Sequence, residues 1–252
     1  MKTTAKHISF LRLMLIPLLS LLLLVPADAL GAPKNRNRRD KLLNRPYADM
    51  KRIHLGFSIG THFQDLKFTH NGYTTPTGEQ WFVEIPSYSP GFCVNVLADL
   101  RLHKYFNLRL SPGMYFGNKN VEMRDYVTGT SMTQNVKTPY LVVPLDLKFS
   151  GERYFNSRPY VVGGVMAAFD LSKKRSDYLQ FKSTDFYLSV GFGCDFYLPF
   201  FKLNPEIKFC FGLSDVLSHD RPDLDDNPEQ MKITQSLKKV KSNMIVLTFY
   251  FE

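Results

Sequence analysis

Serine, histidine and carboxylate side chains are the first candidates for chemistry in this 252-residue chain. His54 and His62 share one face of a segment with period-two alternation, and Ser58 lies between them. Asp185 and Ser189 share one face of a later segment. We predict no catalytic residue among them, because an inward-facing set of charged side chains accounts for the same pattern by packing.

That set lies on the polar faces of several alternating segments. Its members are Asp99, Arg101, Arg109, Asp146, Lys148, Asp195, Lys202, Glu206 and Lys208. Burying an unpaired charge is costly, whereas nearly balanced pairs are tolerated. We therefore predict a buried network of ion pairs across a narrow interior.

Metal and cofactor sites are not predicted, because no metal-ligand spacing occurs. The three cysteines are an odd number, so at least one is a free thiol. Cys93 and Cys210 lie on the inward pattern and Cys194 on the opposite one. The acidic run over residues 220–229 lacks the spacing of a calcium loop and is expected to be a solvated external loop.

Two glycine clusters resemble part of a nucleotide-binding loop. Gly191 and Gly193 belong to one of them, and Gly163-Gly164 forms the other. Each lies inside a predicted strand with no helix after it, so a phosphate-binding loop is excluded. These glycines are expected to make room for large inward neighbours.

The elements that position these side chains are strands. In Ser183–Phe211 apolar residues alternate with polar ones on both sides of a break at Pro199-Phe200, which predicts a hairpin of two long strands. Each is about ten residues long, which suits a tilted strand that crosses a bilayer. A soluble barrel with its apolar face inside is the alternative, but the polar face is rich in Gly and Ser rather than in long charged side chains.

The same alternation recurs along the chain and predicts an eight-stranded antiparallel transmembrane β-barrel of the outer-membrane type, an all-β fold. The expected strands are Ile53–Phe63, Phe92–Leu102, Phe106–Gly117, Tyr140–Phe149, Pro159–Leu171, Asp185–Leu198, Lys202–Leu213 and Asn243–Glu252. No helical run of eighteen apolar residues follows residue 29. Eight strands enclose a lumen that side chains fill, so no pore is expected.

Connections of alternating length give this barrel a direction. The second, fourth and sixth connections are short, and the others are long: Thr69–Pro90, a loop that ends at about Lys137, Ser172–Thr184 and Ser214–Ser242. Short periplasmic turns and long external loops are the rule in such barrels. Aromatic residues at the short-turn end predict an interfacial girdle: Tyr105, Phe106, Tyr154, Phe155, Tyr160, Tyr197, Phe200, Phe201, Phe249 and Phe251.

The chain before the barrel divides in two. Residues 1–29 have a basic start, an apolar run and the sequence Ala27-Asp28-Ala29, which together predict a secretory signal peptide. Residues 30–52 carry much of the net charge of +9, and we expect a flexible periplasmic arm, with the barrel over 53–252. Nucleic acid is not an expected partner of an exported protein. The candidate docking residues for an acidic partner or anionic lipid are Lys34, Arg36, Arg38, Arg39, Lys41, Arg45, Lys51 and Arg52.

Four blocks of the sequence carry a family resemblance. They are Pro159-Tyr160-Val161 before Gly164, PLDLKF over Pro144–Phe149, GFGCDFYLPFFKLNPEIKFCFGL over Gly191–Leu213, and the ending LTFYFE over Leu247–Glu252. In them the chain resembles the PorT family of outer-membrane barrels over about residues 50–252. The resemblance implies a non-enzymatic barrel, with outer-membrane lipid around it. It also implies a role with other components of the type IX secretion system, which exports proteins with C-terminal sorting domains such as gingipain-type proteases and adhesins.

The resemblance supplies no catalytic residue and no cofactor. Two other functions stay open at this point. One is a surface barrel for adhesion or envelope stability, and the other is a lipid-modifying barrel enzyme. The phenotype of a deletion separates them: export of sorting-domain proteins survives in the first case, and lipid A changes in the second.

Overall fold

The computed structural model describes residues 43–73, 78, 81–84, 89–125, 129–172, 179–218 and 236–252. The chain forms two compact units, residues 1–43 and 44–252, and the second is the one described below. The predicted signal peptide, most of the predicted basic arm and the acidic run over 220–229 lie outside the described residues. None of the helices in the described ranges is long and apolar enough to cross a membrane.

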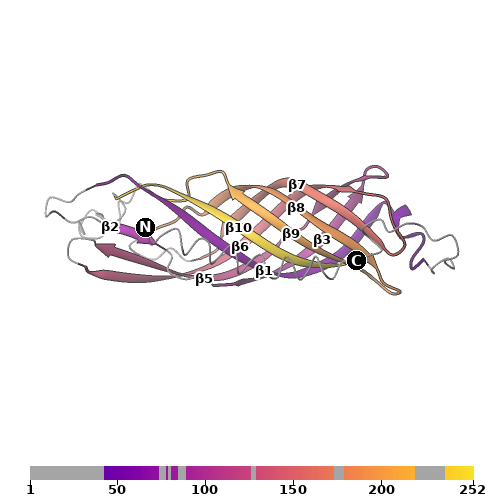
Figure 1. Ribbon diagram of the computed structural model, residues 1–252, viewed down its shortest axis with the longest axis horizontal. Helices are drawn as coiled ribbons and strands as arrows, with labels where there is room; N and C mark the ends of the chain where they lie inside the picture. The colour runs from indigo at the N-terminus through magenta and orange to yellow at the C-terminus, as the bar shows by residue number, and fades with distance from the viewer. Residues whose placement is uncertain are drawn as a thin grey trace, which may run out of the picture. The chain divides into compact units, whose positions relative to one another are not determined.

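Antiparallel β-strands make up nearly all of the described part of the second unit, preceded by the 3-10 turn η2 (Ala48–Met50). The strands are β1 (Ile53–His70), β2 (Trp81–Glu84), β3 (Gly91–Arg101), β4 (Phe106–Leu110), β5 (Gly113–Asp125), β6 (Ser131–Ser150), β7 (Ser157–Asp170), β8 (Thr184–Tyr197), β9 (Lys202–Gly212) and β10 (Leu237–Phe251). Figure 1 shows them slanted and wrapped around a common axis.

The strand pairings lead around this axis and return to their start. β1 pairs with β10 on one side and with β3 on the other, and β10, β9, β8, β7 and β6 follow in order. β4 and β5 both lie between β3 and β6, separated only by Ser111-Pro112, where proline has no N–H for the ladder. Counted as one strand, they complete a ring of eight in the described part of the chain, as the alternation predicts.

The two faces of this ring differ in polarity as predicted. Along β8 the alternate residues Phe186, Leu188, Val190 and Phe192 are exposed and apolar, whereas the residues between them are buried. Exposed apolar side chains surround the ring and form an apolar belt that includes Leu55, Phe57, Ile59, Val94, Val96, Leu145, Leu147, Val161, Val165, Phe186, Leu188, Val190, Phe192 and Phe211. Apolar surface of this extent is stable against lipid rather than water.

Several strands extend beyond the predicted limits. The predicted loop to about Lys137 is wrong: β5 continues to Asp125 and β6 begins at Ser131. β1 reaches His70, β10 begins at Leu237, and the predicted loop Thr69–Pro90 contains the short strand β2, which pairs with β5. These extensions lie above the apolar belt, so their outward residues are polar. The alternation of apolar and polar residues that predicts the strands is therefore absent there.

The aromatic girdle at the short-turn end is present with two corrections. Phe57 stacks on Phe251 with ring centroids 5.1 Å apart, and Phe106 lies 5.1 Å from Phe149. Tyr160 and Tyr197 are buried in the lumen instead of facing lipid. Their positions along β7 and β8 have inward parity. The prediction was wrong because it rested on the clustering of aromatic residues at this end and not on the parity of each residue.

Candidate functional site

The lumen near the short turns holds a charged layer, and Arg109 lies at its centre. This fully buried guanidinium donates from Nη1 to Glu206 Oε2 at 2.9 Å and from Nε to Asp99 Oδ2 at 3.2 Å. β4 and β9, which supply Arg109 and Glu206, lie on opposite sides of the ring. The ion pair therefore crosses the lumen.

The lysines of the charged layer are paired as the sequence predicts. Lys148 Nζ donates to both carboxylate oxygens of Asp195, at 2.7 and 2.8 Å. Lys208 Nζ donates to Asp146 Oδ2 at 2.5 Å and lies 3.3 Å from Glu206 Oε1. Together with Arg109 and Lys202, these lysines make four cations that face a similar number of carboxylates, which makes their burial tolerable.

Two members of the layer differ from the prediction. Glu252, the last residue, was not predicted: its side chain forms an ion pair with Lys202 and lies 3.6 Å from Arg109 Nη2. The alternation in Leu247–Glu252 was the available signal, since it gives residue 252 inward parity. Arg101 is not in the layer; its Nη1 donates to the Asp49 carbonyl at 2.5 Å, because β3 ends there at the rim.

Aromatic rings close the remaining space around these charges. The Arg109 guanidinium lies 4.7 Å from the Tyr250 ring centroid, and Lys148 Nζ lies 4.0 Å from that of Tyr160. Gly193 makes this possible, because a Cβ there would lie 2.5 Å from the Tyr160 hydroxyl. Gly193 therefore makes room for a large inward side chain, as expected, whereas Gly163 shares its outward parity with Val161 and Val165, so the expectation is wrong for Gly163.

The candidate catalytic side chains have structural partners. Ser58 lies in Gly56-Phe57-Ser58-Ile59-Gly60, which matches a G-x-S-x-G nucleophile pattern that the sequence reasoning overlooked. That pattern requires a turn from strand to helix, whereas Ser58 lies within β1 and accepts from Asn95 Nδ2 at 2.9 Å. Ser189 donates to Asp146 at 2.9 Å.

The histidines and Asp185 also contact neighbours other than these serines. His62 packs against the Tyr115 ring at 5.1 Å between centroids, and His54 Nδ1 lies 3.8 Å from Glu252 Oε2. Asp185 accepts from the Phe186 N–H at 2.8 Å. These contacts serve packing and do not assemble a nucleophile, base and acid.

Above the charged layer, apolar and polar side chains of the described residues fill the lumen. A middle layer contains Cys93, Tyr115, Val142, Met166, Ala168, Tyr187, Cys210, Met244 and Val246. Val142 is fully buried in this layer. All three cysteines are free thiols, which confirms the prediction of at least one.

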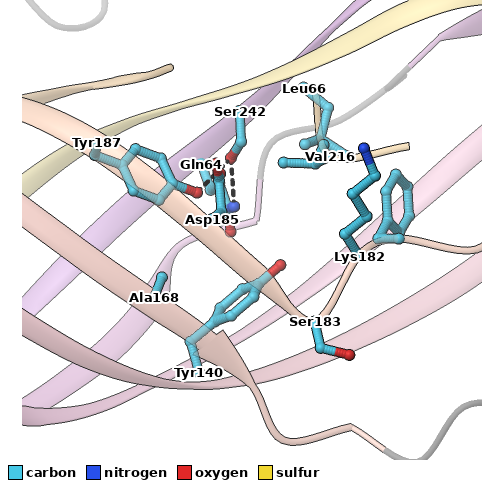
Figure 2. A pocket seen from close by; sticks show the side chains of 11 residues that line it. Gln64, Leu66, Tyr140, Ala168, Lys182, Ser183, Asp185, Tyr187, Val216 and Ser242 are labelled. Carbon is cyan, nitrogen blue, oxygen red and sulfur yellow. Dashed lines mark hydrogen bonds between the residues drawn. The ribbon is translucent and has the colours of Figure 1, made fainter. Parts of the chain in front are cut away.

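A small pocket lies next to the middle layer (Figure 2). Gln64 Nε2 and the Tyr187 hydroxyl both donate to Ser242 Oγ, at 2.6 and 2.9 Å, and Asp185 and Tyr140 lie beside them. Its volume is about 20 Å³, which is enough for a water molecule. The pocket is therefore too small for an organic substrate.

The long-loop end of the lumen is closed by an outer cluster. Its buried members are Leu66, Val83, Val121, Met123, Leu179, Val216, Leu217, Leu237 and Val240. Leu179, Val216 and Leu217 come from connections between strands, and β1, β5 and β10 supply most of the others. The strand extensions above the belt are thus stabilised by a hydrophobic core of their own.

The short-turn end is covered by a cap, residues 44–52, which belongs to the predicted flexible arm. Arg45 Nη1 donates to the Glu252 carbonyl at 3.0 Å, and Asp49 accepts from the Tyr197 hydroxyl at 2.5 Å. Asp49 also lies 3.6 Å from Arg158 Nη1, and the Arg153 guanidinium stacks 3.6 Å from the Tyr197 ring centroid. This part of the arm is folded onto the barrel instead of extending from it.

The predicted docking residues are only partly within the described ranges. Lys51 and Arg52 are exposed, whereas Arg45 contributes to the cap. Lys34, Arg36, Arg38, Arg39 and Lys41 lie outside the described residues. The structure therefore gives Arg45 a structural contact and leaves the docking role of the set as a proposal.

Comparison with known proteins identifies the family. Residues 35–218 match the model of a family described as outer membrane protein beta-barrel domain. A search of curated protein sequences found no match. The solved barrels that resemble this chain are distant, and similarity at their level says nothing about function.

Two of them illustrate this distance. OprG from Pseudomonas aeruginosa is 14% identical, with a TM-score of 0.42 over 79% of this chain and 90% of its own. Neisserial surface protein A is 11% identical, with a TM-score of 0.40 over 79% of this chain and 97% of its own. The family match, in contrast, spans most of the chain, whose ring of strands and apolar belt suit a bilayer. The chain belongs to the outer membrane protein beta-barrel domain family, and it is a barrel of the outer membrane.

Proposed function

We propose that this barrel is a non-enzymatic component of the type IX protein secretion system and that it acts by docking other components. The observation that carries the proposal is the filled lumen: the cap, the charged layer, the middle layer and the outer cluster occupy it from one end to the other. A secreted protein cannot pass through such a barrel, so a role in secretion depends on its surfaces.

The resemblance to the PorT family supports the choice of secretion system. Its most specific part, Phe196–Glu206, spans the turn of the β8–β9 hairpin and supplies Lys202 and Glu206 to the charged layer. The cargo proposed from this resemblance is the set of proteins with C-terminal sorting domains, including gingipain-type proteases and adhesins.

The cap provides the docking surface in this proposal. Tyr47 and Met50 are 72% and 69% exposed, and Lys51 and Arg52 beside them are also exposed. In outer-membrane barrels the short turns face the periplasm. An apolar pair flanked by basic residues suits a periplasmic or outer-membrane partner with an acidic rim around an apolar contact.

A surface barrel for adhesion or envelope stability is the second candidate. It is favoured by the outer cluster, which holds the strand extensions together above the belt. A lipid-modifying enzyme ranks third, because Ser58 and Ser189 have structural partners.

Deletion of the gene tests these functions. Loss of surface delivery, with precursors of sorting-domain proteins accumulating in the envelope and rescue by the wild-type gene, is the expected result. Normal export would eliminate the secretion function. Normal export with altered lipid A would identify the enzyme, and normal export with loss of adherence or membrane integrity would identify the surface barrel.

A crosslinking experiment tests the docking surface. A photocrosslinking residue at Tyr47 or Met50 is expected to capture a secretion component in outer membranes, identified by mass spectrometry. Arg124, which is exposed on β5 beyond the apolar belt, is the matched control position. Capture of the same component from both positions would argue against docking at the cap.

A further inference from the structure

Four lysines gather on the outer face of the barrel where β1 and β10 leave the apolar belt. Lys67 and Lys241 are directly opposite each other in the ladder, and both are exposed. Lys239 follows on the same face opposite Thr69. Like charges directly opposite each other destabilise a sheet. An anion bound between Lys67 and Lys241 would relieve this repulsion.

A β-bulge adds the fourth lysine. Thr69 pairs with Lys239 and His70 pairs with Leu237, which leaves Lys238 without a partner in the ladder. A bulge re-aims the extra side chain, and Lys238 is exposed although its position in the alternation has inward parity. We call Lys67, Lys238, Lys239 and Lys241 the lysine patch.

Carboxylates near the lysine patch do not balance it in the described part of the chain. Asp65 is half-buried on the same face, opposite Asn243. Asp215 accepts from the Val240 N–H at 2.9 Å and from the Leu217 N–H at 3.2 Å, and these two carboxylates together offset at most two of the four lysine charges. The patch thus keeps an excess of positive charge.

The distance of the lysine patch from the end of the apolar belt places it near the lipid headgroups. Phe63 and Ile245 form the last apolar pair on this face, and Lys67 follows Phe63 by four residues, or roughly 13 Å along the strand. With a strand tilt of about 40°, this is about 10 Å along the bilayer normal. The headgroup region begins at the edge of the hydrocarbon and is roughly 5–8 Å thick, and a lysine side chain reaches back across the remaining distance.

We propose that the lysine patch binds the phosphate of a lipid headgroup in the outer leaflet. The site is lateral, on the lipid-facing wall of β1 and β10, and it is independent of docking at the cap. A phosphate between Lys67 and Lys241 satisfies both ammonium groups and removes their repulsion, which fixes the two-stranded extension at the membrane surface.

Lipid selectivity of the protein purified from outer membranes tests this. In phosphatidylcholine vesicles, spin-labelled phosphatidic acid is expected to associate with the barrel more strongly than spin-labelled phosphatidylcholine. Replacement of all four lysines by Gln should lower this preference at least fivefold, since each lysine near an anionic surface contributes about fivefold. The four Lys→Arg replacements, which keep the charge, should retain it.

Folding of each variant is verified by its faster migration on unboiled gels. Should the fourfold Gln variant fail to fold, Lys67→Gln with Lys241→Gln is measured instead. Equal association of both lipids with the wild type, or an unchanged preference in the Gln variant, would overturn the proposal. Binding to soluble heparin is measured for the wild type and the fourfold Gln variant as well. If the variant loses heparin binding but keeps the lipid preference of the wild type, the proposal is overturned and the patch is a polysaccharide site.

Discussion

Arg109 on β4 and Glu206 on β9 form an ion pair of 2.9 Å across the lumen, between strands on opposite sides of the ring. Neither strand is paired with the other, so this contact exists only in the closed barrel. Nη2 of the same guanidinium lies 3.2 Å from Asp99 Oδ2 and 3.6 Å from Glu252 Oε1. Arg109 therefore joins four strands through one side chain.

Replacement of Arg109 by Met is expected to lower the free energy of unfolding by about 3–5 kcal/mol, because it leaves buried carboxylates without their cation. Replacing Glu206 by Gln in the same chain should restore part of the loss, since one of those carboxylates is then neutral. Urea unfolding in lipid vesicles measures both. Lys104→Met, at an exposed ion pair with Glu152, is the control and should leave the midpoint unchanged.

Arginine on the lipid face of β8 should be costly in a way that depends on depth. Phe192→Arg or Val190→Arg is expected to destabilise the barrel by roughly 2–4 kcal/mol near the bilayer midplane. Thr184→Arg has the same outward parity but lies at the strand end, so its cost should be about 0–1 kcal/mol. Equal stability of all three variants in bilayers would show that the assigned lipid face is wrong.

The reconstituted barrel should not conduct ions. The charged layer, the middle layer and the outer cluster occupy the lumen, and the pocket beside them has room for a water molecule only. Planar-bilayer recordings are expected to show a flat baseline under conditions in which a porin opens. Reproducible conductance steps from the purified protein would mean that the layers separate in a membrane.

Removal of the Asp49 carboxylate should release the cap. Asp49→Ala deletes the acceptor of the Tyr197 hydroxyl and the partner of Arg158, at a cost of roughly 1–2 kcal/mol. Trypsin cleavage after Lys51 or Arg52 should then be about 5–30 times faster, since cleavage follows the open population. Asp65→Ala, on β1 near the other end, is the control, and equal acceleration in it would contradict a local effect.

Neutralisation of the basic arm should weaken secretion without loss of the barrel. Gln at Lys34, Arg36, Arg38, Arg39, Lys41, Lys51 and Arg52 is expected to give a partial defect in surface delivery, because attraction to an acidic partner depends on charge and is screened by salt. Arg45 is left in place because it donates to the Glu252 carbonyl in the cap. Full export by this variant, with unchanged barrel levels, would show that the arm is not the docking surface and would point to the loops and turns instead.

The sequence alone determined the eight strands where they cross the apolar belt, the faces of most of their residues and the short turns. Alternation is a local property, because successive side chains of a strand point to opposite sides. Val161 and Val190 could therefore be assigned to lipid, and Asp146 and Lys208 to the lumen, before any partner was known. The mixed signs of the inward charges also predicted that they would pair.

Only the tertiary structure decided which residues meet. The partner of Arg109 depends on ring closure and on the stagger of the strands, which no single strand encodes. Glu252 enters the charged layer because β10 lies between β1 and β9, and Asn44–Arg52 becomes a cap because Tyr197 and Glu252 are brought to the same end. The opposition of Lys67 and Lys241 likewise depends on the register between the first and last strands, which are joined only when the barrel closes.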